Sequence, residues 1–260
     1  MKLLTLTSAI LMSGSVWAHN SCDIDLNAHV RIDNKVVEFS DENQPLYKIV
    51  DDKYLYVEGD KVSLDKQQQV LITQYSKDIK ALVPEVRGVV TEGIDLAVEG
   101  VGLAFNELLG EDNDVGNELT SELTIIKDEL AQKLSLEHGV SIGKEGVADD
   151  NFFGKEFENR IETVVESAVK KSMGTLLIAV GKEMLFSGGD PEAFEARMEN
   201  FGEQIETEME SRAEELEKKA NVLCYSVKKL DEQEEHLREE VSELAPFNMI
   251  KVDSRHSDKI

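Results

Sequence analysis

The fold of this chain is decided by residues 190–244, which read DPEAFEARMENFGEQIETEMESRAEELEKKANVLCYSVKKLDEQEEHLREEVSEL. Asp190 and Pro191 form a strong helix start, because an acid at the N-cap and proline at the first helical position both favour initiation. Large apolar residues then recur every seven positions: Met209, Leu216, Leu223, Leu230, Leu237 and Leu244. A second series, four positions later, is small or apolar except at Glu234. This a/d pattern predicts a long helix with one apolar packing face, of the kind found in coiled coils.

The start of the chain predicts export. Lys2 is followed by an apolar run that ends at Trp17, and Ala18 occupies the position of a signal-peptidase site. We expect residues 1–18 to be a signal peptide that is cleaved after Ala18, which predicts a periplasmic protein. An uncleaved anchor is an alternative, although the run is shorter than the roughly 20 apolar residues that span a bilayer. A lipoprotein modified at Cys22 is another, but the residues before Cys22 depart from a lipobox.

The composition is strongly acidic, with 53 acidic against 28 basic residues and a formal net charge of −25. Phosphate backbones and anionic headgroups repel such a chain. We therefore expect neither nucleic acid nor an anionic membrane surface as a partner. A well-solvated surface is the simplest explanation of the acidity, and a role in binding cations or a basic partner is the alternative.

Cys22 and Cys224 are the two cysteines of the chain. In an exported protein a disulfide is the expected state of such a pair, and only one intramolecular pairing exists. This bond would tie the start of the mature chain to its last long helix. Two buried free thiols are the alternative.

Residues 22–64 predict strands. Val30 and Ile32 alternate with polar neighbours, and the segments 36–39, 46–50, 54–57 and 62–64 are separated by turn residues. This pattern predicts an antiparallel meander of four or five short strands. A sheet of that size needs helices against one face.

Helical periodicity replaces the strands after Asp65, which forms a capping-box pattern with Gln68. We expect helices over residues 66–109, 118–136 and 152–186, with a loop over residues 138–150. Pro84 should kink or break the first helix, and its glycines should weaken it or let a neighbouring helix approach closely. The predicted fold class is α+β and mainly α, with a small N-terminal antiparallel meander followed by long antiparallel amphipathic helices.

The expected domain organisation is a signal peptide over residues 1–18, one domain over 19–245 and a flexible tail over 246–260. Within the domain, residues 19–64 form the meander and residues 65–245 form the helical bundle. The long acidic helix would repel a parallel second copy, so we expect it to pack within its own subunit and favour a monomer, with a coiled-coil dimer as the alternative. The end after Leu230 should pack loosely, so that Leu223→Ala is costly and Leu244→Ala is mild.

Four features in order resemble the YggN-like periplasmic proteins of unknown function. They are a signal peptide with a cysteine just after it, the run 56–64 (YVEGDKVSL) leading to Pro84, the run 187–191 (SGGDP), and a single cysteine in the last long helix. The resemblance covers the mature chain to about Leu230, and the acidic end beyond departs from it. It implies a periplasmic location, and it implies no activity, substrate or catalytic residue.

The sequence offers no catalytic, cofactor or metal residues. It lacks the HExxH, GxSxG, P-loop and GxGxxG motifs. Ser-x-x-Lys occurs at Ser167 and at Ser226, inside predicted helices and without partner motifs. His138 and His236 lack the Glu-x-x-His spacing of di-metal bundles. The run 112–116 resembles a calcium loop but misplaces its glycine, and is interpreted as a turn.

Three classes of function follow. The favoured one is a non-catalytic exported protein whose helices bind a protein partner or an apolar ligand. An envelope holdase or stress-related structural protein is the alternative, as is an enzyme of unrecognised type. A ligand would need an internal cavity lined by residues such as Phe105, Phe157, Leu177 and Met184, whereas a holdase would need an exposed apolar groove.

Overall fold

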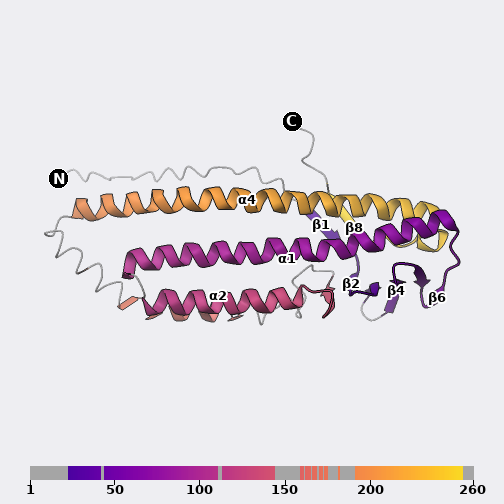
Figure 1. Cartoon of the computed structure of the whole chain (residues 1–260), viewed down its shortest axis with the longest axis horizontal. Coiled ribbons are helices and arrows are strands. Elements are labelled where there is room, and N and C mark those ends of the chain that lie inside the picture. Colours follow the sequence, from indigo (N-terminus) through magenta and orange to yellow (C-terminus); the bar gives the residue numbers. More distant parts are fainter. Residues whose placement is uncertain are drawn as a thin grey trace, which may run out of the picture.

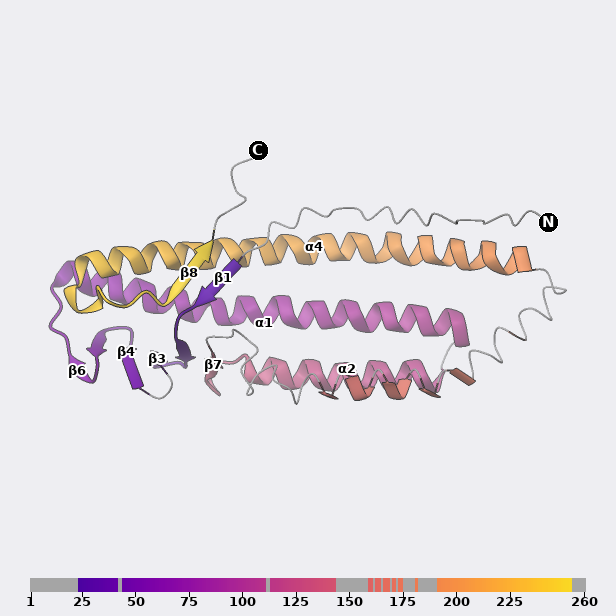
Figure 2. The same cartoon turned by 180° about the vertical axis from the view of Figure 1, so that it is seen from behind.

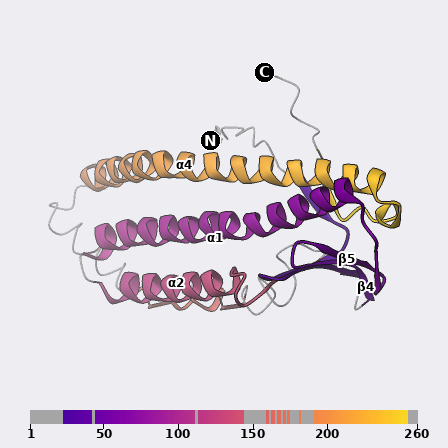
Figure 3. The same ribbon diagram turned by 45° about the vertical axis from the view of Figure 1, so that its right-hand side comes forward.

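The computed structural model describes residues 23–41, 44–110, 113–143 and 191–253, with short stretches between residues 159 and 181. Helix α1 (Lys66–Leu109) is the central layer of an elongated molecule (Figure 1). Helix α4 (Pro191–Glu240) runs along one side of α1. Helix α2 (Asp114–Lys133) and a sheet share the other side, with α2 under the far half of α1 and the sheet under its first turns (Figure 3). The expected α+β, mainly α class is confirmed.

The sheet has six antiparallel strands in the order β6-β5-β4-β3-β2-β7. Their bounds are β2 His29–Ile32, β3 Val36–Asp41, β4 Gln44–Val50, β5 Tyr54–Val57, β6 Asp60–Lys61 and β7 Val140–Ile142. Alternate side chains of the central strands are buried against α1, among them Val37, Phe39, Ile49 and Leu55. The meander is confirmed, whereas β7 lies where a loop was expected. Three residues after α2 suffice to extend the sheet because they pair with β2.

Helix α1 starts as expected, since the Asp65 side chain accepts the N–H groups of Gln67 and Gln68 while the Gln68 side chain caps Asp65. Pro84 was expected to kink or break this helix, and the break is wrong, because α1 continues through Pro84 for a total of 44 residues. Packing against both α4 and the α2 side compensates for the one backbone hydrogen bond that proline removes. The described residues of the expected 152–186 helix are helical between 159 and 174, and Ala168 packs on Val115 and Leu119 of α2.

Helix α4 packs antiparallel on α1 within the same chain, as expected. A Cβ placed at Gly100 would lie 3.3 Å from Sδ of Met209, and one at Gly93 would lie 3.6 Å from Cδ2 of Leu216. The seven-residue spacing of these glycines therefore matches the seven-residue spacing of the α4 side chains. Ion pairs flank the contact, from Lys219 to Glu92 at 2.6 Å and from Arg212 to Glu99.

The structure of the C-terminal end of the chain differs from two expectations. Leu230, Leu237 and Leu244 are 2%, 1% and 3% exposed, whereas Leu223 is only half-buried, so the end of α4 is the tightly packed part. Residues 246–253 are not a flexible tail. A short 3₁₀ turn (η1, Ser242–Leu244) reverses the chain, and β8 (Ile250–Asp253) then pairs antiparallel with β1 (Asp23–Leu26).

Figure 2 shows this β1–β8 ribbon lying across α4 and α1. Ile250 of β8 and Met249 just before it join the main core, which anchors this segment to the helices. The sequence pattern missed it because a four-residue strand carries little periodicity of its own. Among the described helices, none is both long and apolar enough to cross a membrane.

Candidate functional site

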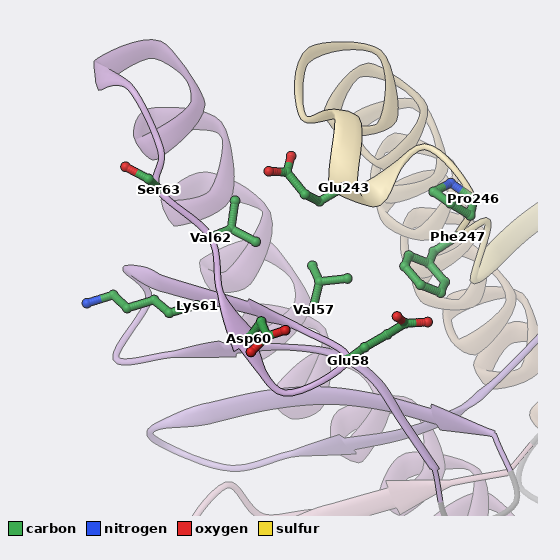
Figure 4. A pocket seen from close by; sticks show the side chains of 9 residues that line it. All are labelled: Val57, Glu58, Asp60, Lys61, Val62, Ser63, Glu243, Pro246 and Phe247. Carbon is green, nitrogen blue, oxygen red and sulfur yellow. The ribbon is translucent and has the colours of Figure 1, made fainter.

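A groove opens where the sheet meets the C-terminal turn (Figure 4). It has a volume of ≈ 410 Å³. One wall is the β5–β6 hairpin and the chain that leads into α1, and the other is the segment that follows α4. The lining residues are Val57, Glu58, Asp60, Lys61, Val62, Ser63, Glu243, Pro246 and Phe247.

The groove combines an apolar floor with three carboxylates. Val57, Val62 and Phe247 supply the apolar surface, and Glu58, Asp60 and Glu243 supply the charge. Within the described part of the chain, none of these three carboxylates forms an ion pair with a basic side chain. The one lysine of the lining, Lys61, instead lies 4.3 Å from the ring centroid of Tyr54. Such a groove suits a cation carried on an apolar stem.

The hairpin wall has a fixed shape. Glu58 and Gly59 both adopt positive φ, at 50° and 96°, which closes a two-residue turn between the paired residues Val57 and Asp60. Positive φ at both positions matches the twist of antiparallel strands. The Glu58 N–H also donates to the Leu46 carbonyl at 2.8 Å, which fixes the turn to β4.

The opposite wall is held by a buried carboxylate. Glu234 of α4 is 3% exposed, and its Oε2 accepts the N–H groups of Met249 and Ile250 at 2.8 and 2.9 Å. Its Oε1 accepts the hydroxyls of Tyr47 and Tyr75 at 3.1 and 3.0 Å. One side chain thus joins α4, α1, the sheet and the C-terminal segment.

Burial shifts the pKa of all three members of this cluster. Burial raises the pKa of Glu234, and burial together with the Glu234 carboxylate raises the pKa of both tyrosines well above the usual value. The centroid of the Phe247 ring, which lines the groove, lies 6.0 Å from the centroid of the Tyr47 ring. The cluster therefore packs against the Phe247 wall of the groove and helps to position it.

A second polar cluster fixes the far end of the β4–β5 hairpin. Asp52 Oδ1 accepts from Lys80 Nζ at 2.6 Å and from Ser76 Oγ at 2.8 Å. Lys80 also donates to the Asn34 carbonyl at 3.0 Å. Burial alone would raise the pKa of Asp52, but the hydrogen bonds from Lys80 and Ser76 and the nearby lysine charges together lower it. These contacts anchor the sheet to α1 and so hold the hairpin wall in place.

Two other hollows are less suited to a ligand. One of ≈ 430 Å³ lies between α1 and α4, where Asp78 already accepts from Gln74 and Gln233, both at 2.8 Å. One of ≈ 210 Å³ lies between α2 and residues 163–168. Ion pairs of Arg160 with Glu129 and of Lys171 with Glu118 bridge the same two elements.

The residues singled out in the sequence lie apart from the groove. His236 is exposed and lies 3.9 Å from Glu239, on a solvated face of α4. Asn113, in the calcium-like run, caps α2 by accepting the Gly116 N–H at 2.6 Å. Lys170 pairs with Glu166, and Lys229 lies over the Tyr225 ring. The described residues contain no group of three His, Cys, Asp or Glu side chains placed to hold a metal ion.

Other predicted residues are only partly covered. Cys22 lies outside the described residues, so its bond to Cys224, a half-buried residue of α4, stays a prediction. Of the proposed cavity lining, Phe105 packs against the small core of Val115 and Leu119. Phe157, Leu177 and Met184 lie outside the described residues.

The groove residues were missed because the hairpin and the C-terminal turn are 180 residues apart in sequence, and no periodicity links them. Glu234 could have been singled out from the sequence, since it is the one acid among the small or apolar residues of the second heptad series.

Comparison with known proteins places residues 22–250 in one family model, described as "Protein of unknown function (DUF2884)". No curated protein matches the chain. No solved structure matches it either. The matched region begins at Cys22, spans the sheet and the helices and reaches the start of β8, and the chain therefore belongs to this family of proteins of unknown function.

Proposed function

We propose that this chain is a non-catalytic, exported protein that binds a basic segment of a partner protein in the groove between the β5–β6 hairpin and the C-terminal turn. The observation that carries the proposal is the set of three carboxylates, Glu58, Asp60 and Glu243, around the apolar floor of a preformed groove. A lysine or arginine side chain fits this chemistry, because its stem can lie on Val62 and Phe247 while its cation meets the carboxylates.

The location in the periplasm is part of the proposal. It is supported by the leader-like residues 1–18, and by the resemblance to YggN-like periplasmic proteins. An exported protein meets partners outside the cytoplasm, where a strongly acidic surface also keeps it soluble.

The geometry favours a partner protein over the other two candidates. An apolar ligand would need an enclosed cavity, and the hollows between the described helices are open and partly polar. A holdase would need a continuous apolar surface. The exposed large apolar residues of the described chain are instead spread over several elements: Ile24, Val70, Ile125, Met173, Val222 and Tyr225.

Isothermal titration with a short peptide that carries two lysines tests this proposal. The double variant Glu58→Gln/Glu243→Gln should weaken binding about threefold to tenfold, since each exposed ion pair contributes roughly 0.2–1 kcal/mol. The control Glu214→Gln/Glu217→Gln removes the same charge from exposed positions of α4 and should leave the affinity unchanged. An equal loss in both variants would show that only net charge attracts the peptide.

A further inference from the structure

The outer face of the sheet, which points away from α1, carries a row of mostly basic side chains, which is unusual for this acidic protein. Val30, Val37, Ile49 and Leu55 point inward and are buried, so their strand neighbours point outward. Strand register aligns the outward side chains into one row across five strands: Arg31, Glu38, Lys48, Tyr56 and Lys61. This row has three bases and one acid, in a chain with 28 bases and 53 acids.

A second row beside it is apolar. Val36, Val50 and Tyr54 are paired in register one step along the strands. Tyr54 lies between two cations, with Lys61 Nζ at 4.3 Å and Lys53 Nζ at 5.3 Å from its ring centroid. Lys48 lies 5.7 Å from the Tyr56 ring centroid. The lysines are thus held at the surface beside aromatic rings, whereas Arg31 lies 4.0 Å from the Asp33 carboxylate. Within the described chain no helix covers this face.

We propose that this lysine–tyrosine face, defined by Arg31, Lys48, Lys61, Tyr54 and Tyr56, docks an acidic amphipathic helix of another protein. The basic row would meet carboxylates on one side of such a helix, and the apolar row would meet its apolar side. Four gaps between five strands span about 19 Å. A helix of about 13 residues has the same length, so the face fits three to four turns.

A protein helix fits better than an anionic membrane. The few cations of this face are set on a molecule with a net charge of −25, which an anionic bilayer repels as a whole. A single helix contacts the face without bringing the acidic remainder of the molecule against a charged plane. This surface goes beyond the carboxylate groove, because it lies on the outer face of the sheet and binds the opposite charge, although Lys61 borders both.

The test uses the full mature chain and a synthetic helical peptide of about 15 residues, with glutamates on one side and leucines on the other. Amide shifts in nuclear magnetic resonance spectra locate the peptide, and fluorescence anisotropy gives the affinity. The variant Lys48→Glu/Lys61→Glu should weaken binding about tenfold or more, with shifts of the wild type confined to β2–β6. The control Lys66→Glu/Lys218→Glu reverses two exposed charges elsewhere and should change the affinity less than about twofold.

Several results would overturn the proposal. They are shifts outside the sheet, an equal loss in the control variant, or no binding by the peptide. Binding of phosphatidylglycerol vesicles in place of the peptide would assign the face to a membrane, and salt-sensitive self-association lost in Lys48→Glu/Lys61→Glu would assign it to a second copy.

If the charge reversal prevents folding, Lys48→Gln/Lys61→Gln replaces it. Glu58→Gln/Glu243→Gln should leave peptide binding intact, which separates this surface from the groove.

Discussion

At the scale of single residues, Glu234 has the most consequences. In the heptad pattern this position departs from the rest, because an acid stands where the other residues of the series are small or apolar. In the fold it is buried and accepts four hydrogen bonds from groups on three other elements. A buried carboxylate is costly unless its lone pairs are occupied, and here the donors come from β4, α1 and the C-terminal segment.

Glu234→Leu should destabilise the protein by about 3–5 kcal/mol, because two N–H groups and two hydroxyls lose their acceptor. Glu239→Gln, on the exposed side of the same helix, should change stability by less than about 0.5 kcal/mol. Urea unfolding monitored by circular dichroism measures both. A mild effect of Glu234→Leu would show that the donors find water instead.

The pH dependence of Glu234 has a defined sign. Burial raises its pKa in the folded state above 4.5, so folding favours the protonated form. The stability that this pKa shift contributes to the fold is therefore fully present below the unfolded-state pKa of Glu234, and it is lost as the pH rises through the folded-state pKa. Relative to Glu234→Gln, the wild type should lose stability from pH 4 upward. If the wild type instead becomes more stable relative to Glu234→Gln as the pH rises, the four hydrogen bonds outweigh the cost of desolvating the carboxylate.

At the scale of elements, the heptad predicted a packing face but not where it is buried. Leu237 is fully buried in the main core, whereas Leu216, which faces Gly93 of α1, is half-exposed. Periodicity shows which side of a helix is apolar, and the neighbours that cover it depend on strands far away in sequence. The start of α1 was predictable because its capping box is local. β7 and β8 were not, since each depends on pairing with a distant strand.

Leu237→Ala should cost about 2–5 kcal/mol, as a fully buried large-to-small change does. Leu216→Ala, its partner in the same heptad series, should cost less than about 1.5 kcal/mol because its site is half-exposed. Equilibrium unfolding of both variants compares the two ends of α4 directly. Equal costs would contradict the uneven packing.

At the scale of the whole molecule, the β1–β8 ribbon bears on the predicted disulfide. β1 begins at Asp23, directly after Cys22, and pairs with β8. The Val252 N–H donates to Asp231 on α4 at 3.1 Å, and Cys224 lies two helical turns before Asp231. The ribbon therefore contacts α4 two helical turns from Cys224, and the Cys22–Cys224 bond stays a prediction.

Peptide mapping of the protein from the envelope fraction should recover a chain that begins at His19 and one Cys22–Cys224 cross-link under non-reducing conditions. Cys224→Ser should then lower the melting temperature, because the bond restricts the unfolded chain. Two alkylatable thiols in the native protein would refute the bond. A mass that retains residues 1–18 would refute the cleaved leader.

The central claim is that a rigid sheet end carries a groove for a basic segment, and hydrogen exchange tests it most directly. We predict that a lysine-bearing peptide slows exchange in residues 57–63 and 242–249, and leaves residues 195–225 of α4 unchanged. Without the peptide, the slowest amides should lie in residues 230–241, where α4 is most buried. Slowing confined to residues 195–225 would contradict the claim and place the binding surface on the far end of the helices.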